Sequence, residues 1–570
     1  MSLIPNSKLG RWAFAGIGSL GLLLAACGGT PAATGTVPKQ ITLVGDVASN
    51  PTWWFSVTPV SFNSTSNFAT SYMYQGLLWI SKTDTINYSR SIASSITPSN
   101  NDTVYTIKLN PKWKWSNGEP VTAADCVYAW DLAHWSAATG APWIDSNVGS
   151  HSFDEITNAV ATSTYTLVVT VAAPISPLYV ELASLGYLSP VPKFAVDKYS
   201  NHNQELSYLE KIGVNPANPL FKIVDGPYVI SKVVKNDYFI MKANPRYAGH
   251  QAAIKTIVFQ DEATAASEFA ATKTGLFAQT APGAAYYTAG KQIKGYLQKP
   301  VPYNYGFQMI EPNYSSKAPA IGGLFNQLYF RQAMQMGINQ PAIIKAFYHG
   351  YGVPEWAPVP RLPASPFYDT ATKGYAFNPA AGLKLMEQNG WTLNSNHVLT
   401  RNGVTLSFTM MVTSGSTTMA DVAQYLKTTW AEEGIDVHLD LLPFNQLITF
   451  VTTPSDANKW TLTWWGGWST GLGFPPLSLY ETGAANNFGG FASPSLNSLA
   501  LATYRPGTIS QVYSRVHAYD LAAAHDLPVL LLPETTPAYQ LVKPWLHGVE
   551  KYSVPIDAYQ ELWRWTVTAQ

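Results

Sequence analysis

The chain has few charged residues, and this shortage sets the first limit on its function. Asp, Glu, Lys and Arg make up 12% of its 570 residues, about half of the roughly 25% that is usual. The 35 basic and 35 acidic side chains cancel, so no positive surface argues for a nucleic-acid partner. A surface of Ser, Thr, Asn and Gln changes little in charge with pH, which suggests the hypothesis of an acidic habitat.

Cysteine is almost absent, which excludes a disulfide framework and a cysteine metal site. The two cysteines are Cys27 and Cys126, and Cys126 is expected to pack as a small apolar side chain in an amphipathic helix. Ten histidines are scattered without H-x-x-H, H-x-x-x-H or H-E-x-x-H spacing. We therefore predict no metal site and no cofactor.

The N-terminus has the pattern of a signal peptide over residues 1–27. Lys8 and Arg11 precede a largely apolar run that ends before Cys27, and the run is too short for a comfortable membrane span. The sequence "LAAC" before and at Cys27 resembles the bacterial lipobox, in which the cysteine is lipidated. Residues 28–37 then form a polar tether. The alternative is an ordinary secretory signal with a chance cysteine.

A chain of this length is expected to form two or more domains. Residues 103–109 alternate as a strand, and Thr122 with Asp125 reads as a capping box. After about residue 310 helices alternate with strands, which indicates an α/β lobe. One such helix begins at Asn378, and no long linker separates the lobes.

Residues 467–471, "GWSTG", match the nucleophile-elbow pattern G-x-S-x-G. An elbow requires a strand before the serine and a helix directly after it. Gly471, Gly473, Pro475 and Pro476 follow Ser469 and exclude that helix. A secreted serine hydrolase using Ser469 is therefore the lesser alternative; Asp520 and His525 lie downstream without informative spacing.

Several segments together resemble the extracellular solute-binding proteins of family 5, the binding components of ABC importers for peptides and nickel. They are "YTIKLNPKWKWSNGEPVTAADCVYAW" (105–130), "DGPYVISKVVKNDYFIMKANPRYAG" (225–249) and "FRQAMQMGINQPAIIKAFYHGYGVP" (330–354). The resemblance extends over about residues 40–570. It implies a non-enzymatic, monomeric protein at the outer face of a membrane, which captures peptides and delivers them to a membrane permease. A sensor that binds ligand for a membrane receptor is a further alternative.

The resemblance also implies the fold, an α/β periplasmic-binding-protein type II fold of two lobes with an extra inserted domain. Domain I is expected to comprise residues 38–78, 223–308 and 534–570. The inserted domain is expected at 79–222 and the opposite lobe at 309–533. The two crossovers near "YGFQMI" and "VLLLPE" are then the hinge, and closure of the lobes captures the ligand.

The family resemblance gives the "GWSTG" segment a second interpretation, as the wall of a ligand cleft. It is similar to the family's G-W-x-x-D-x-x-x-P strand end, with Trp468 in the tryptophan position and Ser469 beside it. In peptide-binding relatives the aspartate pairs with the peptide ammonium, and here Gly471 stands in its place. No Asp or Glu occurs from 460 to 480. Either another acid supplies the charge, or the ligand is a sugar, an opine or another solute without that ammonium.

Further candidates for the ligand site are aromatic and amide side chains, for each of which packing or solvent exposure is the alternative. Arg361 is a candidate for a ligand carboxylate, whereas Arg331 is expected to be structural. The predicted ligand-binding candidates outside the "GWSTG" segment are Trp143, Trp53, Asn67, Trp356 and Asn487.

Overall fold

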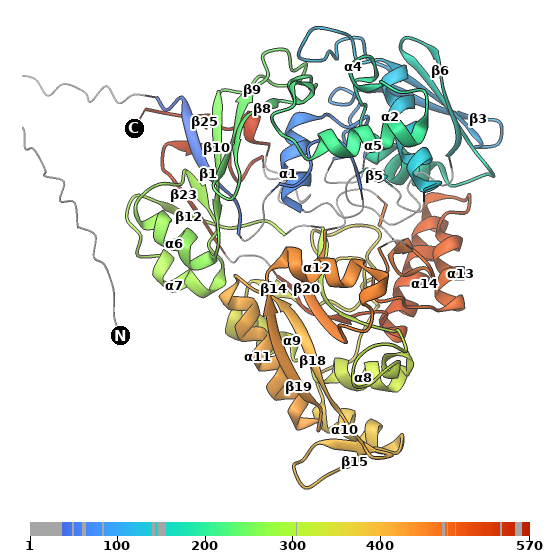
Figure 1. Ribbon diagram of the computed structural model, residues 1–570, viewed down its shortest axis with the longest axis vertical. Helices are drawn as coiled ribbons and strands as arrows, with labels where there is room; N and C mark the ends of the chain where they lie inside the picture. The colour runs from blue at the N-terminus through green and yellow to red at the C-terminus, as the bar shows by residue number, and fades with distance from the viewer. Residues whose placement is uncertain are drawn as a thin grey trace, which may run out of the picture.

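Two β-sheets, one in each of two lobes, organise the chain in the computed structural model (Figure 1). The inserted segment, within residues 79–222, lies beside the upper sheet (Figure 1). The lower lobe narrows with distance from the upper lobe (Figure 1). The structure describes residues 37–47, 51–59, 64–81, 85–139, 143–145, 156–303, 305–469, 474–475, 477–484, 486–535, 539–552 and 561–569.

The upper lobe is built on a seven-stranded sheet in the order β12-β23-β11-β1-β10-β9-β8. β1 lies parallel to β10 and β11, and β9 lies antiparallel to β10. Ile41 and Leu43 alternate along β1 and are both buried, as a sheet with a covered face requires. The strands are β1 (Gln40–Val47), β8 (Tyr228–Val234), β9 (Tyr238–Ala243), β10 (Thr256–Glu262), β11 (Gln279–Thr280), β12 (Leu297–Lys299) and β23 (Gln540–Val542).

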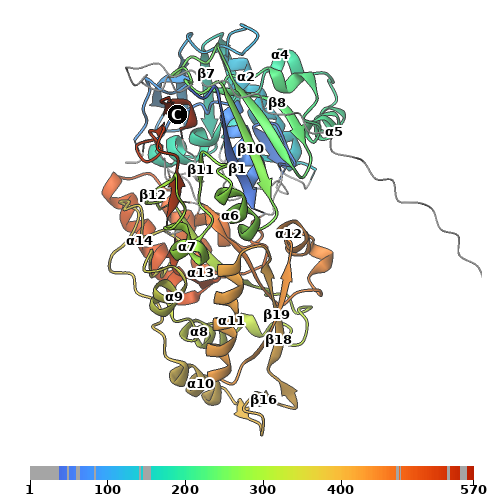
Figure 2. The same cartoon turned by 90° about the vertical axis from the view of Figure 1, so that its left-hand side faces the viewer.

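Helices α1 (Ser64–Met73), α6 (Ala265–Lys273) and α7 (Tyr287–Gly290) belong to the same lobe. α6 lies at its lower edge, above the lower lobe (Figure 2). Thr264 caps α6 by accepting a hydrogen bond from the backbone N–H of Ser267 at 3.1 Å. The helix therefore begins directly after β10, at the edge of the lobe that faces the other sheet.

The inserted segment forms an antiparallel sheet in the order β3-β4-β7-β6, packed on α2 (Ala123–Ala137). The predicted capping box is confirmed, since the N–H of Thr122 donates to Asp125 Oδ2 at 2.8 Å. Cys126 is fully buried, as expected. The other elements are β3 (Ala93–Ser99), β4 (Val104–Leu109), β6 (Ile156–Ser163), β7 (Thr166–Val171), α3 (Pro177–Tyr179), α4 (Lys193–Val196) and α5 (His202–Gly213).

The lower lobe is built on a five-stranded sheet in the order β19-β18-β20-β13-β21. β18 runs parallel to β19 and β20, and β13 runs antiparallel to β20. The helix predicted at Asn378 is confirmed, because its side chain accepts from the N–H of Ala381 at 3.0 Å. The strands are β13 (Gly306–Pro312), β18 (Ser407–Thr413), β19 (Asp436–Leu442), β20 (Leu462–Ser469) and β21 (Leu530–Leu531).

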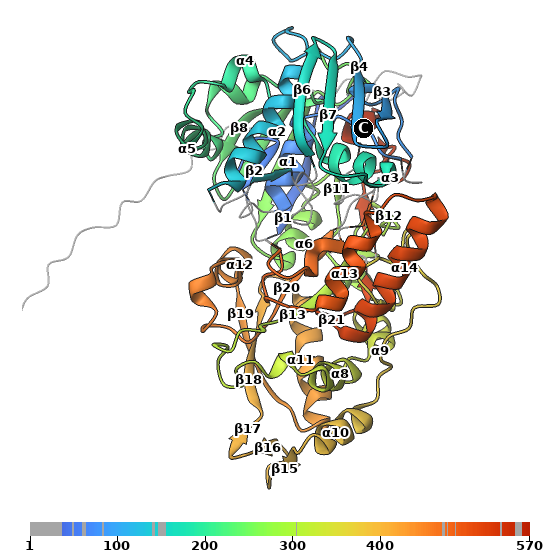
Figure 3. The same ribbon diagram turned by 90° about the vertical axis from the view of Figure 1, so that its right-hand side faces the viewer.

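Helices surround this lower sheet on both sides, which confirms the expected α/β lobe (Figures 1 and 3). They are α8 (Leu328–Met336), α9 (Gln340–Phe347), α10 (Pro379–Gln388), α11 (Thr417–Glu432), α12 (Phe444–Thr452), α13 (Pro494–Thr503) and α14 (Ile509–Asp526). Short strands complete the chain: β2 (Val57–Pro59) with β5 (Trp143–Asp145), β14 (Gly352–Val353) with β22 (Glu534–Thr535), β15 (Thr392–Leu393) with β16 (Leu399–Arg401) and β17 (Val404–Thr405), and β24 (Leu546–His547) with β25 (Thr566–Val567).

The chain crosses between the two large sheets twice, once from β12 to β13 and once from β21 to β23. These crossings fall at the segments expected to form the hinge. At the second crossing, Glu534 Oε2 accepts from the N–H of Leu362 at 3.0 Å, and burial raises the pKa of its carboxyl to about 9. The two crossings are neighbours, because β12 pairs with β23 in one sheet and β13 pairs with β21 in the other. Two adjacent crossings are the arrangement about which lobes can hinge.

Candidate functional site

β20 carries one extra residue relative to its partner strand β13, and this changes the direction of its tryptophan side chains. β20 pairs with β13 so that Trp468 faces Phe307 and Gly467 faces Gln308, and the register shifts between Met309 and Glu311. An added residue on one strand is a β-bulge, which bends the strand and redirects side chains. Here the bulge places Trp464 and Trp465 opposite a single residue of β13.

Gly467 lies where no side chain fits. A Cβ atom there would be 2.0 Å from the carbonyl oxygen of Phe307 and 2.8 Å from the Cα of Gln308. Both are backbone atoms, so no side-chain rotation relieves the contact. The close approach of the two strands therefore depends on this glycine.

Three aromatic side chains gather beside this glycine: Trp465, Trp468 and Phe488, hereafter the aromatic wall. The rings of Trp465 and Trp468 lie 5.0 Å apart, nearly perpendicular, and Phe488 lies 5.8 Å from Trp468. Edge-to-face packing of this kind fixes ring orientation. Trp468 is half-buried, and its Nε1–H has no hydrogen-bond partner among the described residues.

A buried carboxylate fixes the aromatic wall from behind. Glu311 on β13 is 3% exposed; its Oε2 accepts from Trp465 Nε1 at 2.8 Å and its Oε1 from the N–H of Gly489 at 2.8 Å. Burial raises the pKa of Glu311 to about 7, although both hydrogen bonds act to lower it. Trp465 is therefore held by two contacts, its ring against Trp468 and its N–H on Glu311.

A second feature, hereafter the inter-lobe pocket, lies between α6 and the start of α11. Its volume is about 310 Å³, at the small end of the range for ligand pockets. The upper lobe contributes Glu268 and the stretch 281–285, and the lower lobe contributes Gln308 and the stretch 415–419. Because both lobes line it, the pocket takes its shape only when they approach each other.

The aromatic wall and the inter-lobe pocket lie on opposite faces of the β13–β20 pair. Successive residues of a strand point to opposite faces, and cross-strand partners share a face. Phe307 and its partner Trp468 belong to one face, whereas Gln308, which lines the pocket, belongs to the other. The end of the sheet thus presents an aromatic surface on one side and a polar surface on the other.

The lobes touch at two separate places. Near the pocket, the N–H of Ala265 donates to the carbonyl oxygen of Gly415 at 3.3 Å. On the other side, α3 of the inserted segment reaches α13, where the N–H of Ser176 donates to the carbonyl of Tyr504 at 2.8 Å and Tyr179 lies 5.0 Å from Phe474. α3 lies above α13 and α14 in Figure 3. The lobes are therefore in contact at both ends of the space between them.

The other predicted ligand residues lie in different surroundings from Trp468. Trp53 is 3% exposed and donates from Nε1 to the carbonyl of Val57 at 3.0 Å. Asn67 is buried in α1. Asn487 is also buried, and its amide bonds the backbone of Glu481 and Phe491. Packing explains these three positions without a ligand.

Trp356 is half-buried, and its ring packs so closely on Gly374 that a Cβ atom added to this glycine would lie 2.6 Å from it. Trp143 and Ser469 belong to β5 and β20, respectively, but their side chains lie outside what the structure describes. Gly471 and Cys27 are also outside the described residues. Arg331 is structural as predicted, since it is 5% exposed and its guanidinium donates to the carbonyls of Asp526 and Phe325.

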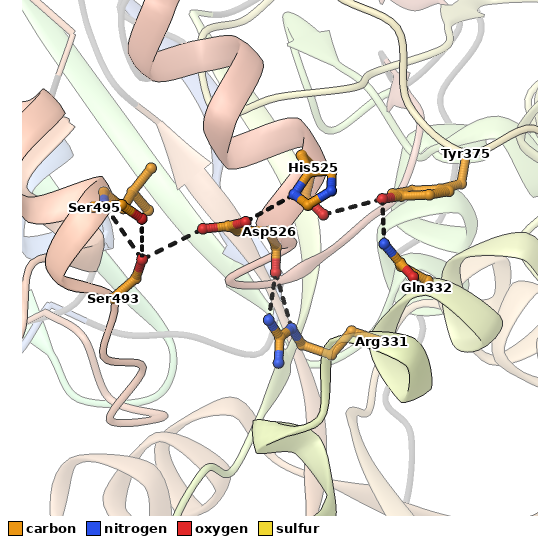
Figure 4. A network of polar contacts seen from close by, with 8 residues as sticks. Arg331, Gln332, Tyr375, Ser493, Ser495, His525 and Asp526 are labelled. Carbon is orange, nitrogen blue, oxygen red and sulfur yellow. Dashed lines mark hydrogen bonds and ion pairs between the residues drawn. The ribbon is translucent and has the colours of Figure 1, made fainter. Parts of the chain in front are cut away.

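The residues proposed as partners of a nucleophilic Ser469 are engaged elsewhere. Asp520 is buried and accepts from the N–H of Val359 at 3.2 Å. His525 Nδ1 contacts Asp526 Oδ1 at 2.9 Å, and Ser493 donates to the other oxygen of that carboxylate at 3.3 Å (Figure 4). A catalytic triad needs histidine between serine and acid, whereas in this contact Asp526 lies between Ser493 and His525.

No group of three or more His, Cys, Asp and Glu side chains suited to a metal ion occurs in the described part of the chain.

Sequence reasoning did not single out Glu268, Gln308 or Glu311. Glu268 is the fourth residue of α6, an alanine-rich helix, and only its isolation among small neighbours distinguishes it. Glu311 and Trp465 are 154 residues apart. The tertiary fold brings these groups to the site, so local pattern carries no signal for them.

Comparisons with known proteins agree with this architecture. The fold is that of the two-lobed type II periplasmic binding proteins, an α/β class. The chain belongs to the bacterial extracellular solute-binding proteins, family 5, whose model matches residues 87–490. No helix among the described residues has both the length and the apolar character needed to cross a membrane.

Individual relatives are similar to the chain at low identity. The oligopeptide-binding protein OppA of Lactococcus lactis subsp. lactis is 24% identical over 69% of this chain and 67% of its own length. A dipeptide-binding protein of Lactococcus lactis subsp. cremoris is 26% identical over 94% of this chain and 95% of its own. The solved structure of the oligopeptide-binding protein AppA from Bacillus subtilis, in complex with a nonapeptide, superposes with a TM-score of 0.78 at 16% identity, covering 94% of this chain and all of AppA.

Proposed function

We propose that this protein captures a solute outside the cytoplasm by closing its two lobes and delivers it to the membrane permease of an ABC importer. Peptides are the leading ligand class, because the relatives described above are peptide-binding proteins by name. Capture needs no covalent chemistry and no cofactor. The observation that carries the proposal is that the end of the β13–β20 pair carries a half-buried aromatic wall on one face and a pocket lined by both lobes on the other.

The physical mechanism is a shift between open and closed arrangements. A ligand that contacts both lobes favours the closed arrangement by its difference in affinity for the two. The half-buried indole of Trp468 offers an apolar face. A Cβ atom on Gly466 would meet nothing within 4 Å, so this glycine leaves room for a ligand backbone to approach. Ser469 and Gly471 follow Trp468 directly in sequence, and we include them in the proposed site. The closed surface is then what the permease recognises.

The proposal includes attachment to a membrane through a lipid on Cys27, with residues 28–37 as the tether. The lipobox-like "LAAC" supports it, and a lipid chain would hold the folded protein at the outer face of a membrane. We propose the domain bounds given above, since the seven-stranded sheet draws its strands from 40–47, 228–299 and 540–542. We expect a monomer.

A non-peptide solute is the second candidate. The observation in its favour is the lack of Asp or Glu between 460 and 480, because a buried ammonium without a carboxylate is costly. Sugars, opines and other solutes without an ammonium group belong to this class.

Native mass spectrometry on residues 28–570, followed by thermal shift with short peptides and with oligosaccharides, tests the proposal. We expect peptides to raise the melting temperature. Trp468→Ala should weaken binding by roughly 10- to 100-fold, as truncation of a buried aromatic anchor does. Trp135→Ala, a half-buried tryptophan that stacks on His202 in the inserted segment, is the matched control. Stabilisation by neither solute class, or equal loss in both variants, contradicts the proposal.

A further inference from the structure

The inter-lobe pocket contains one charged side chain among the described residues that line it, and this is Glu268. The other lining groups are small, hydroxyl, amide or apolar, together with the phenol of Tyr348. A single carboxylate in an otherwise uncharged pocket sets the sign of the ligand group that the pocket can favour.

Glu268 is held in place by the upper lobe. It is 3% exposed, and its Oε1 accepts from the hydroxyl of Thr280 and from the N–H of Ala281 at 3.2 Å. Hydrogen bonds donated to a carboxylate favour its ionised form. Glu268 lies in the first turns of α6, where the positive end of the helix also favours a negative charge. The carboxylate is therefore fixed by its own lobe before any ligand arrives.

The lower lobe contributes neutral oxygen atoms to the same pocket. Thr417 and Thr418 in the first turn of α11, together with the Gln308 amide, line the same pocket. Ser416 already caps the helix by accepting from the N–H of Met419 at 3.2 Å. An ammonium group has three N–H donors, and a carboxylate with hydroxyl and amide oxygens around it can accept all three.

We propose that Glu268 is the counter-ion for a ligand ammonium group in the inter-lobe pocket. The ligand class is then solutes with a free primary ammonium, such as peptides with an unmodified N-terminus. This inference rests on the proposed function and specifies its ligand.

The segment that forms the aromatic wall offers no alternative counter-ion for a ligand ammonium group. Residues 460–480 contain no Asp or Glu. Glu311, the buried acid that bonds Trp465, uses one oxygen for Trp465 and the other for Gly489. Glu311 also lies on the Trp468 face of β13, away from the pocket.

The test uses two synthetic mixtures of di- to octapeptides, one with free N-termini and the same mixture N-acetylated, offered together to the full mature chain. Native mass spectrometry then measures the ratio of free to acetylated peptides retained. We expect the wild type to prefer free N-termini by roughly 10- to 100-fold, the range for a hydrogen bond to a charged group. In Glu268→Gln, which keeps an acceptor for Thr280 and Ala281, the ratio should fall toward one.

Glu262→Gln at the end of β10, outside the pocket, is the matched control and should keep the wild-type ratio. Equal retention of both mixtures by the wild type overturns the inference but leaves the proposed function intact. An unchanged ratio in a folded Glu268→Gln variant also overturns it. Failure to retain any peptide contradicts peptide capture itself. The wild-type ratio does not depend on whether the variant folds.

Discussion

The aromatic wall and the inter-lobe pocket differ in how they are built. The wall belongs to the lower lobe alone, with Trp465, Glu311 and Gly489 joined by hydrogen bonds. The pocket is divided, with Glu268 in the upper lobe and Gln308 in the lower one. The wall therefore exists in any arrangement of the lobes, whereas the pocket forms when they meet. Changes to the buried supports of the wall, Gly467 and Glu311, should therefore alter folding stability, whereas changes at the pocket should alter ligand capture with little effect on the stability of the unliganded protein.

The strongest test of this difference is Gly467→Ala, at the glycine beside the wall. The added Cβ would lie 2.0 Å from the carbonyl oxygen of Phe307, and forcing the strands apart should lower the free energy of unfolding by about 3 kcal/mol. Urea denaturation without ligand measures this. The control is Gly76→Ala, whose Cβ would meet its nearest atom at 3.4 Å. Equal stability of the two variants would show that β13 and β20 are not rigidly paired.

A second test concerns the carboxylate behind the wall. Burial raises the pKa of Glu311 from 4.5 to about 7, so between these values the folded chain holds a proton that the unfolded chain has released. Stability is therefore present at low pH and is lost as pH rises through about 7. Between pH 4 and pH 8 the wild type should lose about 3 kcal/mol more than Glu311→Gln. Denaturation midpoints at several pH values measure this, and parallel profiles would refute it.

The smallest expected effect lies at the pocket. Ala265 is the first residue of α6, a position that tolerates proline, and its N–H donates across the lobes to Gly415. Ala265→Pro removes this hydrogen bond and should weaken binding of the retained peptides by about 1 kcal/mol, roughly fivefold. Titration calorimetry measures the affinity. Ala265→Ser keeps the N–H and is the control. If Ala265→Pro lowers folding stability but leaves the affinity unchanged, the expectation that changes at the pocket affect ligand capture is wrong.

Much of the fold could be predicted from sequence because its signals are local. Thr122 and Asp125 lie three residues apart, and their capping box is confirmed. Asn378 next to Pro379 similarly marks the start of α10. The side chain and the backbone group that form a helix cap belong to the same turn, so the few consecutive residues that contain them are enough to predict it.

The site was only partly predictable, because its key contacts join distant segments. Trp468 could be proposed as a ligand contact, since it belongs to a tryptophan- and glycine-rich strand end. Glu268 could not, because it becomes a pocket residue only when α6 meets α11. Conversely, Trp53 and Asn487 have the composition of ligand residues, but their polar groups bond the local backbone. Residue type alone does not distinguish these two uses.

The contact between α3 and α13 has a consequence for the rate of release. Ser176 and Tyr179 of the inserted segment meet Tyr504 and Phe474 of the lower lobe, in a contact that is separate from the two chain crossings. Because this contact joins the two lobes, it must break when they separate, so its strength adds to the free-energy barrier for opening. Differences in affinity are mostly differences in dissociation rate. The inserted segment therefore helps to set the lifetime of the closed arrangement, which is the time during which a membrane partner can meet it.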